Sequence, residues 1–538
     1  MKQLSEKAIK SPKFYILLAV SITMVIMTLV AIPTLTGKFT NILSPVKVDT
    51  DPENMLVYDE PVRVINREQK KKFTIYDLLV VGITNKTHKN GVFNKKTLAN
   101  VYDLANYAKS LQWENEKGKT EGVISVELIS PSNVDHMEQG GPGTVKFNWL
   151  MAKPPTTDAE ALEVLTKAQT QPILNGSLTS TKGQALALYI PMTSKSVSYK
   201  ISKLLKAKIA SYKGNDKIFV TGMAIAQDTF GVEMFQQMAT ATPMAMMLIF
   251  ALLWFFFRNV ILVSSLMVVA MLSTMATMGL LVVTGYSIHI ASSMVPIFIM
   301  PIAVLDGIHI LSEFYDRYNQ FKDRKKTIQF VMSKLWKPML FTTITTAIGF
   351  AAILLMPLPP LQVFGAFISV GVLIAWFFTM TIVPAYIMLM PERKFAKFGT
   401  EHPGKSEKST YLGRVLGKLG HGSLRYAKPI VLLMIVITIS SIYGASRLRP
   451  NDNPMKWFTE SHELRQADKV LNERFAGSYM AYMSLKADQT GAFKDPELLT
   501  YVSNLQSYII DNNKKTLGKT IAVTEIIKTV HRELFSGD

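Results

Sequence analysis

The chain has 538 residues, 48% of them hydrophobic, and a formal net charge of +19. Its mean hydropathy of +0.19 is too high for an ordinary soluble protein and too low for a chain that lies wholly in a membrane, which predicts several spans and a large water-exposed domain. The absence of cysteine excludes a disulfide framework, a cysteine-based zinc site and a cysteine nucleophile. A large external domain without cysteine is more typical of a bacterial or archaeal envelope than of a eukaryotic lumen.

Most of the excess positive charge lies in short segments beside apolar runs. These segments are Met1–Lys13, Glu313–Lys337 and Pro391–Lys428. Lys and Arg collect on the cytoplasmic side of membrane proteins. We therefore predict that these segments are cytoplasmic, and we expect no nucleic-acid partner.

The first apolar run, residues 14–34, is the first predicted span. A cleaved signal peptide is the alternative interpretation. The run of about 20 residues is longer than the usual apolar core of a signal peptide, and no A-x-A-like cleavage site follows it. We predict an uncleaved anchor, with residues 1–13 in the cytoplasm.

Residues 35–237 form a predicted extracytoplasmic α/β domain. The expected strands are Ile75–Thr84, Gly122–Ile129, Ala185–Ile190 and Lys217–Thr221, and the expected helices are Lys96–Leu111, Asp158–Ala168, Ser196–Tyr212 and a long one from about Met223. Strands that alternate with helices favour an α/β layer of the split β-α-β type. Pro131–Pro142 is predicted to be a loop.

Residues 238–390 form a block of five predicted spans. The runs are long enough to cross a bilayer as helices, and the Lys and Arg asymmetry of the loops agrees with the alternating orientation. Gly365 and Ser369, four residues apart in the last run, predict a close helix contact. The five runs are Met238–Phe257, Val260–Val283, Ser292–Ser312, Pro338–Met356 and Val363–Met390.

Three segments complete the chain. Residues 391–428 are a predicted cytoplasmic linker, residues 429–446 a seventh span, and residues 447–538 the start of a second extracytoplasmic domain. Gly399–Ser406 in the linker matches the phosphate-loop pattern. The buried strand that this motif needs does not precede it, so we interpret the match as chance.

The tail of the chain repeats its beginning. Asp49–Leu56 and Arg449–Phe458 each open an external stretch after a span, and Gly91-Val-Phe is followed 400 residues later by Gly491-Ala-Phe. A predicted helix follows in both copies, and then a β-rich stretch, which in the second copy is Ile521–Ile527. Parallel repeats are a known plan of transporters. The expected architecture is a duplication whose second copy is incomplete.

The run from Met294 to Ser312 contains Asp306. A carboxylate in a span costs several kcal/mol and normally faces a protein interior, where it moves protons, binds ions or holds a partner. We predict that Asp306 is a protonatable site. A neutral, structural aspartate bonded to a threonine hydroxyl is the alternative.

A polar pocket is expected around this carboxylate. Its predicted members are His309 on the same helix and Thr342, Thr345 and Thr346 at a similar depth on the next span, because threonine hydroxyls hydrogen-bond across helices. A metal site made by Asp306, His309 and Glu313 is not favoured, because no further ligands are evident and no metal is expected.

Several stretches resemble the RND superfamily, and the closest branch is the MMPL-type exporters of hydrophobic molecules and lipids. They are Leu305-Asp-Gly-Ile-His309, the TTAIGF run at Thr345–Phe350, and the external segments DNPMKWF and GAFKDPELL. The resemblance implies a polytopic α-helical membrane protein with porter-like α/β domains and a five-span block similar to a sterol-sensing domain. The proton-relay carboxylate of the family falls on Asp306. Many members have a second acid where this chain has Leu305.

The resemblance implies proton-motive-force-driven export of hydrophobic or lipid-like molecules in a bacterial or archaeal inner membrane, with no enzyme activity and no cofactor besides the proton gradient. The expected partners are a lipid or other hydrophobic small molecule, the membrane, and a homo-oligomer or a chain that supplies the second half. The alternative is a non-transporting subunit, either a sterol-sensing-like lipid binder or an auxiliary component that needs a partner chain. Loss of gradient-dependent export in an Asp306→Asn variant would separate the two.

Overall fold

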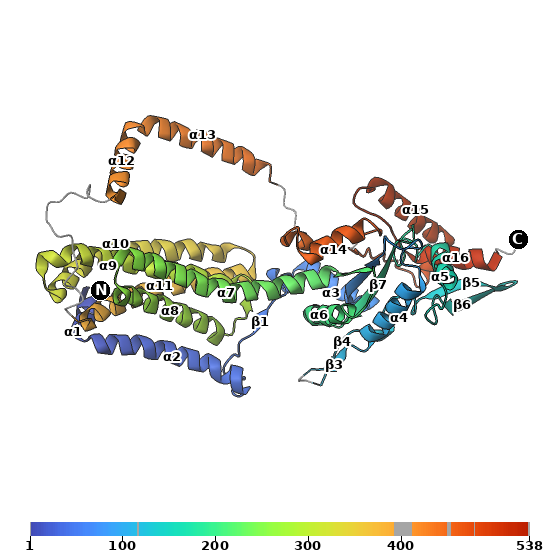
Figure 1. Cartoon of the computed structure of the whole chain (residues 1–538), viewed down its shortest axis with the longest axis horizontal. Coiled ribbons are helices and arrows are strands. Elements are labelled where there is room, and N and C mark those ends of the chain that lie inside the picture. Colours follow the sequence, from blue (N-terminus) through green and yellow to red (C-terminus); the bar gives the residue numbers. More distant parts are fainter. Residues whose placement is uncertain (1, 116–117, 392–410, 449–452, 478, 536–538) are drawn as a thin grey trace. The chain divides into compact units, whose positions relative to one another are not determined.

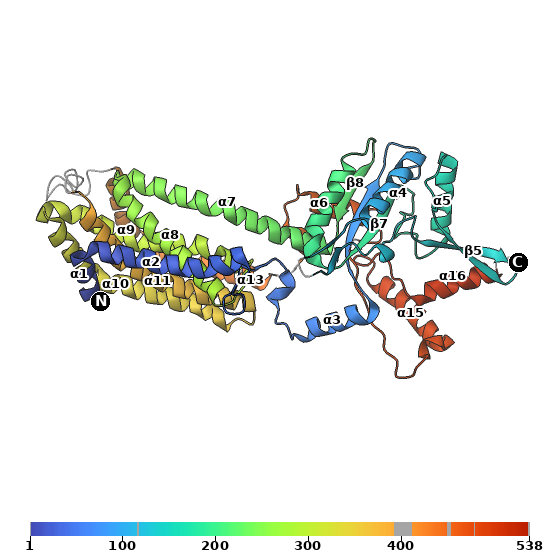
Figure 2. The ribbon, with the colours of Figure 1, turned by 90° about the horizontal axis from the view of Figure 1, so that it is seen from below.

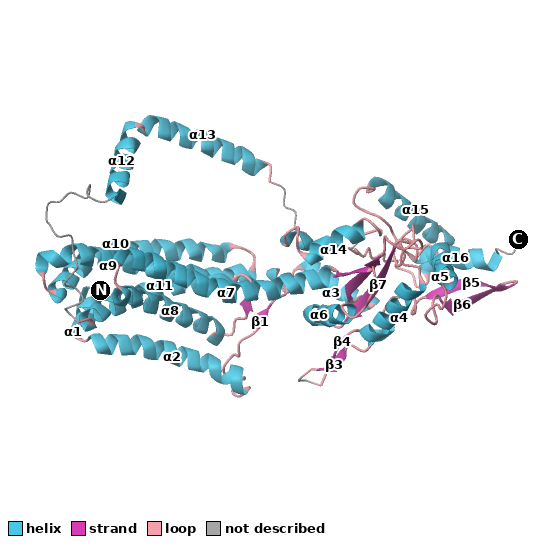
Figure 3. Cartoon of the chain, in the orientation of Figure 1, coloured by secondary structure: helices cyan, strands magenta, loops and turns pink. Residues whose placement is uncertain are grey.

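The computed structural model describes residues 2–115, 118–391, 411–448, 453–477 and 479–535 (Figure 1). The phosphate-loop match in the linker lies outside these residues. Two compact units are present: a membrane unit, Met1–Asp49 with Phe235–Asp452, and an α/β unit, Thr50–Met234 with Asn453–Asp538. Helices make up most of the chain, and the strands lie in the α/β unit apart from the short β1 and β9 (Figure 3).

Within the described residues, seven helices are long and apolar enough to cross a membrane. Each overlaps one of the seven apolar runs of the sequence, and the chain is a polytopic membrane protein. The helices are α2 (Pro12–Thr36), α7 (Met223–Phe257), α8 (Val260–Val283), α9 (Val295–Phe321), α10 (Arg324–Ala351), α11 (Pro359–Leu389) and α13 (Ala427–Ser446).

Helices α8 and α11 form the centre of the membrane unit, and α2, α9 and α10 pack around them. Small residues allow the close contacts. A Cβ on Gly365 of α11 would lie 2.7 Å from the carbonyl oxygen of Phe350, and the Ser369 hydroxyl donates to the carbonyl oxygen of Ala347 at 2.8 Å. The predicted close contact at Gly365 and Ser369 is therefore confirmed.

Two further contacts tie the N-terminal part of the chain to this bundle. Helix α1 (Lys2–Lys10) packs against α10 and α11. The strand β1 (Val48–Asp49), which follows α2, pairs in parallel with β9 (Ile288–His289) between α8 and α9. The end of the first span is thereby attached to the connection between the third and fourth spans.

The α/β unit is built on a three-stranded sheet of order β7-β2-β8, made of β2 (Asp77–Thr84), β7 (Ala185–Met192) and β8 (Lys217–Thr221). Both outer strands run antiparallel to β2. With the connecting helix α6 (Ser198–Ile209), β7 and β8 form a split β-α-β unit around β2, the arrangement that the alternation of elements favours. Its equivalence to a porter domain stays a prediction.

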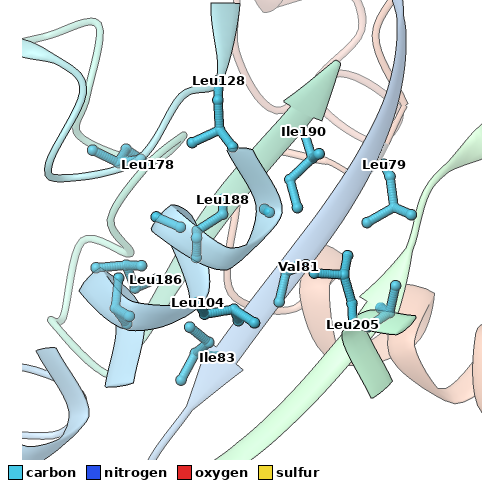
Figure 4. Close-up of a cluster of buried hydrophobic side chains, with 14 of the residues drawn as sticks. Leu79, Val81, Ile83, Leu104, Leu128, Leu178, Leu186, Leu188, Ile190 and Leu205 are labelled. Carbon is cyan, nitrogen blue, oxygen red and sulfur yellow. The ribbon is translucent and has the colours of Figure 1, made fainter. Parts of the chain in front are cut away.

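Side chains alternate between the two faces of β2, as they must in a strand. Leu79, Val81 and Ile83 enter the main core, where helices α4 (Lys95–Lys109) and α6 contribute Leu104 and Leu205 (Figure 4). On the opposite face, Val80 packs with Leu471 of α14 (Glu463–Asn472). A helix from the C-terminal part of the chain therefore covers the outer face of this sheet.

Three predicted elements are wrong. Gly122–Ile129 is not a strand: the short β4 (Thr120–Gly122) pairs with β3 (Gln112–Glu114), and the positive φ of Gly122 ends the extended run. Pro131–Pro142 is not a loop. Strand β5 (Asp135–Gly141) pairs there with β6 (Thr144–Trp149), and Pro142 lies in the turn between them.

The third wrong element is the β-rich stretch Ile521–Ile527, which lies largely within helix α16 (Val523–Phe535). The Glu525 carboxylate accepts the backbone N–H of Ala522 at 2.7 Å and so caps this helix start, which β-branched composition alone does not reveal. The remaining helices of the described chain are α3 (Pro61–Phe73), α5 (Asp158–Thr170), α12 (Tyr411–Arg425) and α15 (Pro496–Asn512).

Candidate functional site

Asp306 lies on the buried side of α9 and is 9% exposed. The next residue, Gly307, allows α8 to come close, because a Cβ there would lie 2.2 Å from Leu266 Cδ2. Most neighbours of Asp306 along α9 are apolar, and several of them are buried. The carboxylate therefore faces the interior of the bundle, as predicted for an ionisable group in a span.

Thr343 of α10 is the hydrogen-bond partner of this carboxylate within the described residues. The Thr343 hydroxyl lies 3.4 Å from Asp306 Oδ2 and 2.8 Å from the carbonyl oxygen of Met339, one turn back on its own helix. A hydroxyl has one proton to donate, and the shorter contact to Met339 is the better one. The ionised carboxylate is thus weakly satisfied.

A protonated Asp306 fits the same geometry without conflict. The carboxylic acid can donate its proton to the Thr343 oxygen while Thr343 donates to Met339, which gives a continuous chain of hydrogen bonds. No ion pair involves Asp306 in the described part of the chain. The arrangement can therefore hold a proton, and loss of that proton leaves a buried charge without a basic partner.

The structure does not bring the four predicted pocket residues to Asp306. His309 is exposed on the surface of the membrane unit. The hydroxyls of Thr342, Thr345 and Thr346 donate to carbonyl oxygens of their own helix, those of Met339, Phe341 and Thr342. The partner of Asp306 does lie on α10, but it is Thr343, which is not one of the four predicted residues.

Thr343 is the residue that the sequence interpretation missed, although its spacing could have identified it. Met339, Thr343 and Ala347 recur every four residues and are the buried positions of this part of α10. Residues four apart share one face of a helix, whereas the adjacent Thr342 is turned away by about 100°. This four-residue spacing favours Thr343 over its neighbour Thr342 as the residue that faces the bundle.

Glu313, two turns after Asp306 on α9, belongs to a separate ion-pair group. Its carboxylate contacts Lys334 Nζ at 2.8 Å and Arg317 Nε at 3.1 Å. The described residues contain no cluster of three or more acidic or histidine side chains that could hold a metal ion. Glu313 thus links α9 to α10 through Lys334 and does not extend the Asp306 site.

Leu305, the neighbour of Asp306, faces the other way. It is 56% exposed and lines a cavity of about 610 Å³ between α7 and α9. The side chains around it are almost all apolar, with Ser312 and Tyr315 at one end. The others are Ile249, Leu252, Leu253, Phe256, Phe257, Pro301, Val304 and Ile308.

Seven long apolar helices, a carboxylate enclosed by three of them and an α/β unit define a polytopic membrane protein with an ionisable site in its bundle. The MMPL family model matches residues 149–415, a stretch that contains all five spans from α7 to α11. The chain belongs to the MMPL family, whose members are transporters of the RND type. None of the curated proteins is significantly similar to it.

Proposed function

We propose that the chain drives the export of hydrophobic or lipid-like molecules with the proton-motive force, and that Asp306 takes up and releases the proton. The observation that supports this most directly is the buried Asp306 carboxylate, whose partner Thr343 already donates to Met339. Ionisable residues inside spans are rare and usually mark an ion or proton path.

The two protonation states of Asp306 favour different arrangements of α9 and α10. The neutral acid completes the hydrogen-bond chain through Thr343 and is compatible with the closed packing around Gly307. The charged form needs water or another donor, so it favours an arrangement that admits one. A proton gradient can perform work through such a difference, because a ligand shifts an equilibrium only by its differential affinity for the two states.

The α7–α9 cavity supports a hydrophobic substrate. Apolar side chains form nearly all of its wall, and its volume of about 610 Å³ is in the range of sites for small molecules. Leu305 in this wall and Asp306 in the bundle are adjacent on α9. A rotation of α9 that follows protonation of Asp306 would therefore change the cavity wall as well.

The proposal includes a cytoplasmic N-terminus in a bacterial or archaeal inner membrane, on the basis of the Lys and Arg distribution. It requires no cofactor other than the proton gradient. We also propose that the chain works as a homo-oligomer or together with a partner chain.

Transport in proteoliposomes tests the proposal. The reconstituted full chain is given an imposed proton gradient, and release of a hydrophobic fluorescent probe, N-phenyl-1-naphthylamine, is followed together with the lumenal pH. We expect gradient-dependent probe movement in the parent chain and its loss in Asp306→Asn. Glu313→Gln is the matched control, because it removes a carboxylate from the same helix outside the proposed path.

Equal transport in the parent chain and Asp306→Asn would refute the role of Asp306. Absence of gradient-dependent transport in the correctly folded parent chain, with the probe still bound, would instead favour the non-transporting lipid-binding subunit.

A further inference from the structure

The β5–β6 hairpin of the α/β unit carries a buried histidine. His136 of β5 is 7% exposed. Two helices from distant parts of the chain meet the hairpin: α5 ends at Gln171, whose side chain contacts the His136 ring, and α16 packs on both strands (Figure 2). A titratable ring thus lies where three elements of the unit meet.

A hydrogen bond joins this ring to the end of α5. Gln171 is 2% exposed, and its Nε2 lies 2.9 Å from His136 Nδ1. The same Nε2 donates to the carbonyl oxygen of Met137 at 3.2 Å. A carbonyl oxygen only accepts, so the amide nitrogen of Gln171, and not its oxygen, belongs on this side. His136 Nδ1 is therefore the acceptor, and the ring is neutral with its proton on Nε2.

Protonation of His136 Nδ1 would turn this acceptor into a donor. The new N–H would face the amide N–H groups of Gln171, and the hydrogen bond to α5 would be lost. A flip of the amide would not repair the contact, because the amide oxygen would then lie against the carbonyl oxygen of Met137. The geometry thus favours the neutral ring.

The strands place one acid and one base on the His136 side of the hairpin. Glu138 Oε2 lies 3.7 Å from His136 Nε2, and Glu138 Oε1 accepts from Asn148 Nδ2 at 2.6 Å. Lys146 of β6 is opposite Glu138, and the uncharged Asn148 is opposite His136. A charged ring would be attracted to Glu138, within its own strand, and not to α5.

The helices add three further charges. Lys167 belongs to α5, and Arg532 and Glu533, which form an ion pair at 2.7 Å, belong to α16. Burial has the largest effect on the pKa of His136 and lowers it. The nearby carboxylates raise this pKa and the nearby cations lower it, and the pKa stays below its ordinary value. The surroundings therefore agree with the hydrogen bond in favouring the neutral ring.

We infer that His136 and Gln171 form an acid-sensitive joint, which holds the β5–β6 hairpin to α5 while the ring is neutral and releases it when the ring is protonated. The docked ring binds a proton less tightly than a released ring in water. Docking is therefore strongest above about pH 6.5, the ordinary pKa of histidine, and weakens as the pH falls below that value. The inference does not depend on Asp306 or on transport.

Release of the hairpin would move an apolar surface. Phe147 and Trp149 leave β6 on the side opposite to Lys146 and Asn148, because side chains alternate along a strand. They are 61% and 55% exposed. The joint thus couples the acidity of the surroundings to the position of two exposed aromatic side chains.

Hydrogen exchange of the full chain in detergent tests the joint. Protection of the amides, corrected for intrinsic exchange, is measured at about pH 7.5 and about pH 5, on either side of the ordinary pKa of histidine. We expect protection of β5 and β6 to fall at least about fivefold at the lower pH, the equivalent of one hydrogen bond, while β2 keeps its protection. Equal protection of the hairpin at the two pH values would overturn the inference.

Two variants identify the groups that act. His136→Gln removes the titrating ring, and Gln171→Leu removes the donor at similar volume. In both we expect the fall to shrink below about twofold, with the hairpin of Gln171→Leu already weakly protected at about pH 7.5. His531→Gln, which replaces an exposed histidine of α16, is the matched control and should show the full fall.

The protection of β2 shows whether each variant is folded. A full fall in His136→Gln would mean that another group titrates, and it would overturn the inference. If burial of the ring were the only cause of acid release, the fall would persist in Gln171→Leu. That result would remove Gln171 from the joint and leave a buried histidine without a switch.

Discussion

Leu471 of α14 occupies the space that a side chain at Gly82 of β2 would need. A Cβ on Gly82 would lie 2.1 Å from Leu471 Cδ2, and Leu471 is 2% exposed. The absence of a side chain in the middle of the central strand thus allows α14, from the C-terminal part of the chain, to pack on the β7-β2-β8 sheet.

Gly82→Ala should therefore lower the free energy of unfolding of the α/β unit by about 1–3 kcal/mol, the usual cost of overpacking. Thermal unfolding of the purified chain measures the loss, and hydrogen exchange of α14 localises it. Gly214→Ala is the control, because the nearest atom to its new Cβ would be 3.8 Å away. The double variant Gly82→Ala with Leu471→Ala should lose less free energy of unfolding than the two single variants together, because the new methyl group fills part of the space that the Leu471 side chain leaves. Strictly additive losses would contradict the contact.

Replacing Thr343 tests the hydrogen-bond chain at Asp306. Thr343→Val removes the hydroxyl at nearly constant volume, so a neutral Asp306 loses its acceptor. Under the proposed function, we expect gradient-driven transport to fall by about five- to tenfold, the equivalent of one hydrogen bond of about 1 kcal/mol. Thr343→Ser should retain most of the activity.

Thr346→Val is the matched control for this experiment, because the Thr346 hydroxyl donates to the carbonyl oxygen of Thr342 on its own helix. A similar loss of transport in Thr343→Val and Thr346→Val would indicate a general effect on α10. Full activity of Thr343→Val would remove Thr343 from the proposed proton site.

The ion pair of Glu53 and Lys195 predicts acid sensitivity of the α/β unit. Burial would raise the pKa of Glu53, but the hydrogen bond and charge of Lys195, with the charges of Lys70 and Arg63, lower the pKa below its ordinary value. Because the folded state binds this proton less tightly than the unfolded chain, the pair stabilises the fold above about pH 4.3. The contribution is lost as the pH falls through the lower pKa of the folded state.

Glu53→Gln should lower the unfolding temperature of the α/β unit at neutral pH and reduce its dependence on pH below about 4.3, the ordinary pKa of glutamate. Thermal unfolding as a function of pH measures both effects. The exposed Glu127 provides the control, as Glu127→Gln should leave the profile unchanged. An unchanged profile for Glu53→Gln would contradict the stabilising pair.

Lys519 connects the C-terminal segment to the loop that follows α5. Its Nζ donates to the carbonyl oxygens of Asn175 at 2.6 Å and Ile173 at 3.2 Å, and to that of Pro172. Lys519→Met keeps the apolar stem but leaves these acceptors unpaired, at a cost of about 1–3 kcal/mol. We expect faster hydrogen exchange in α16 and in the loop after α5, with the exposed Lys515→Met as the control. Equal exchange in the two variants would show that these contacts contribute little.

The sequence predicts the spans well, because the bilayer demands about 20 apolar residues per helix and that length is visible in the chain. It also predicts β2, β7 and β8, whose apolar residues are bounded by turns. The β5–β6 hairpin is missed because Pro142 and the adjacent glycines indicate a loop, although they occupy its turn. Each of these results depends on local pattern.

The candidate site shows the limit of such patterns. Asp306 is identified from its cost in an apolar run, but its partner depends on how α10 is rotated against α9. Thr342 and Thr343 are equivalent in composition, and only the packing of Met339 and Ala347 against the bundle selects Thr343. The contact between Gly82 and Leu471 joins residues nearly 400 positions apart, and no local signal specifies it.

The parallel pairing of β1 with β9 has a consequence for the order of events during synthesis. Val48 is made 240 residues before its partner Ile288, and α2 packs on α8 and α11, which are also made later. At about 5–20 residues per second, the first span is in the membrane for roughly 10–50 s before its own docking surface has left the ribosome. During this time the apolar length of α2 alone must keep the first span in the membrane. Its contacts with α8, α11 and β9 can form only after those elements have been synthesised.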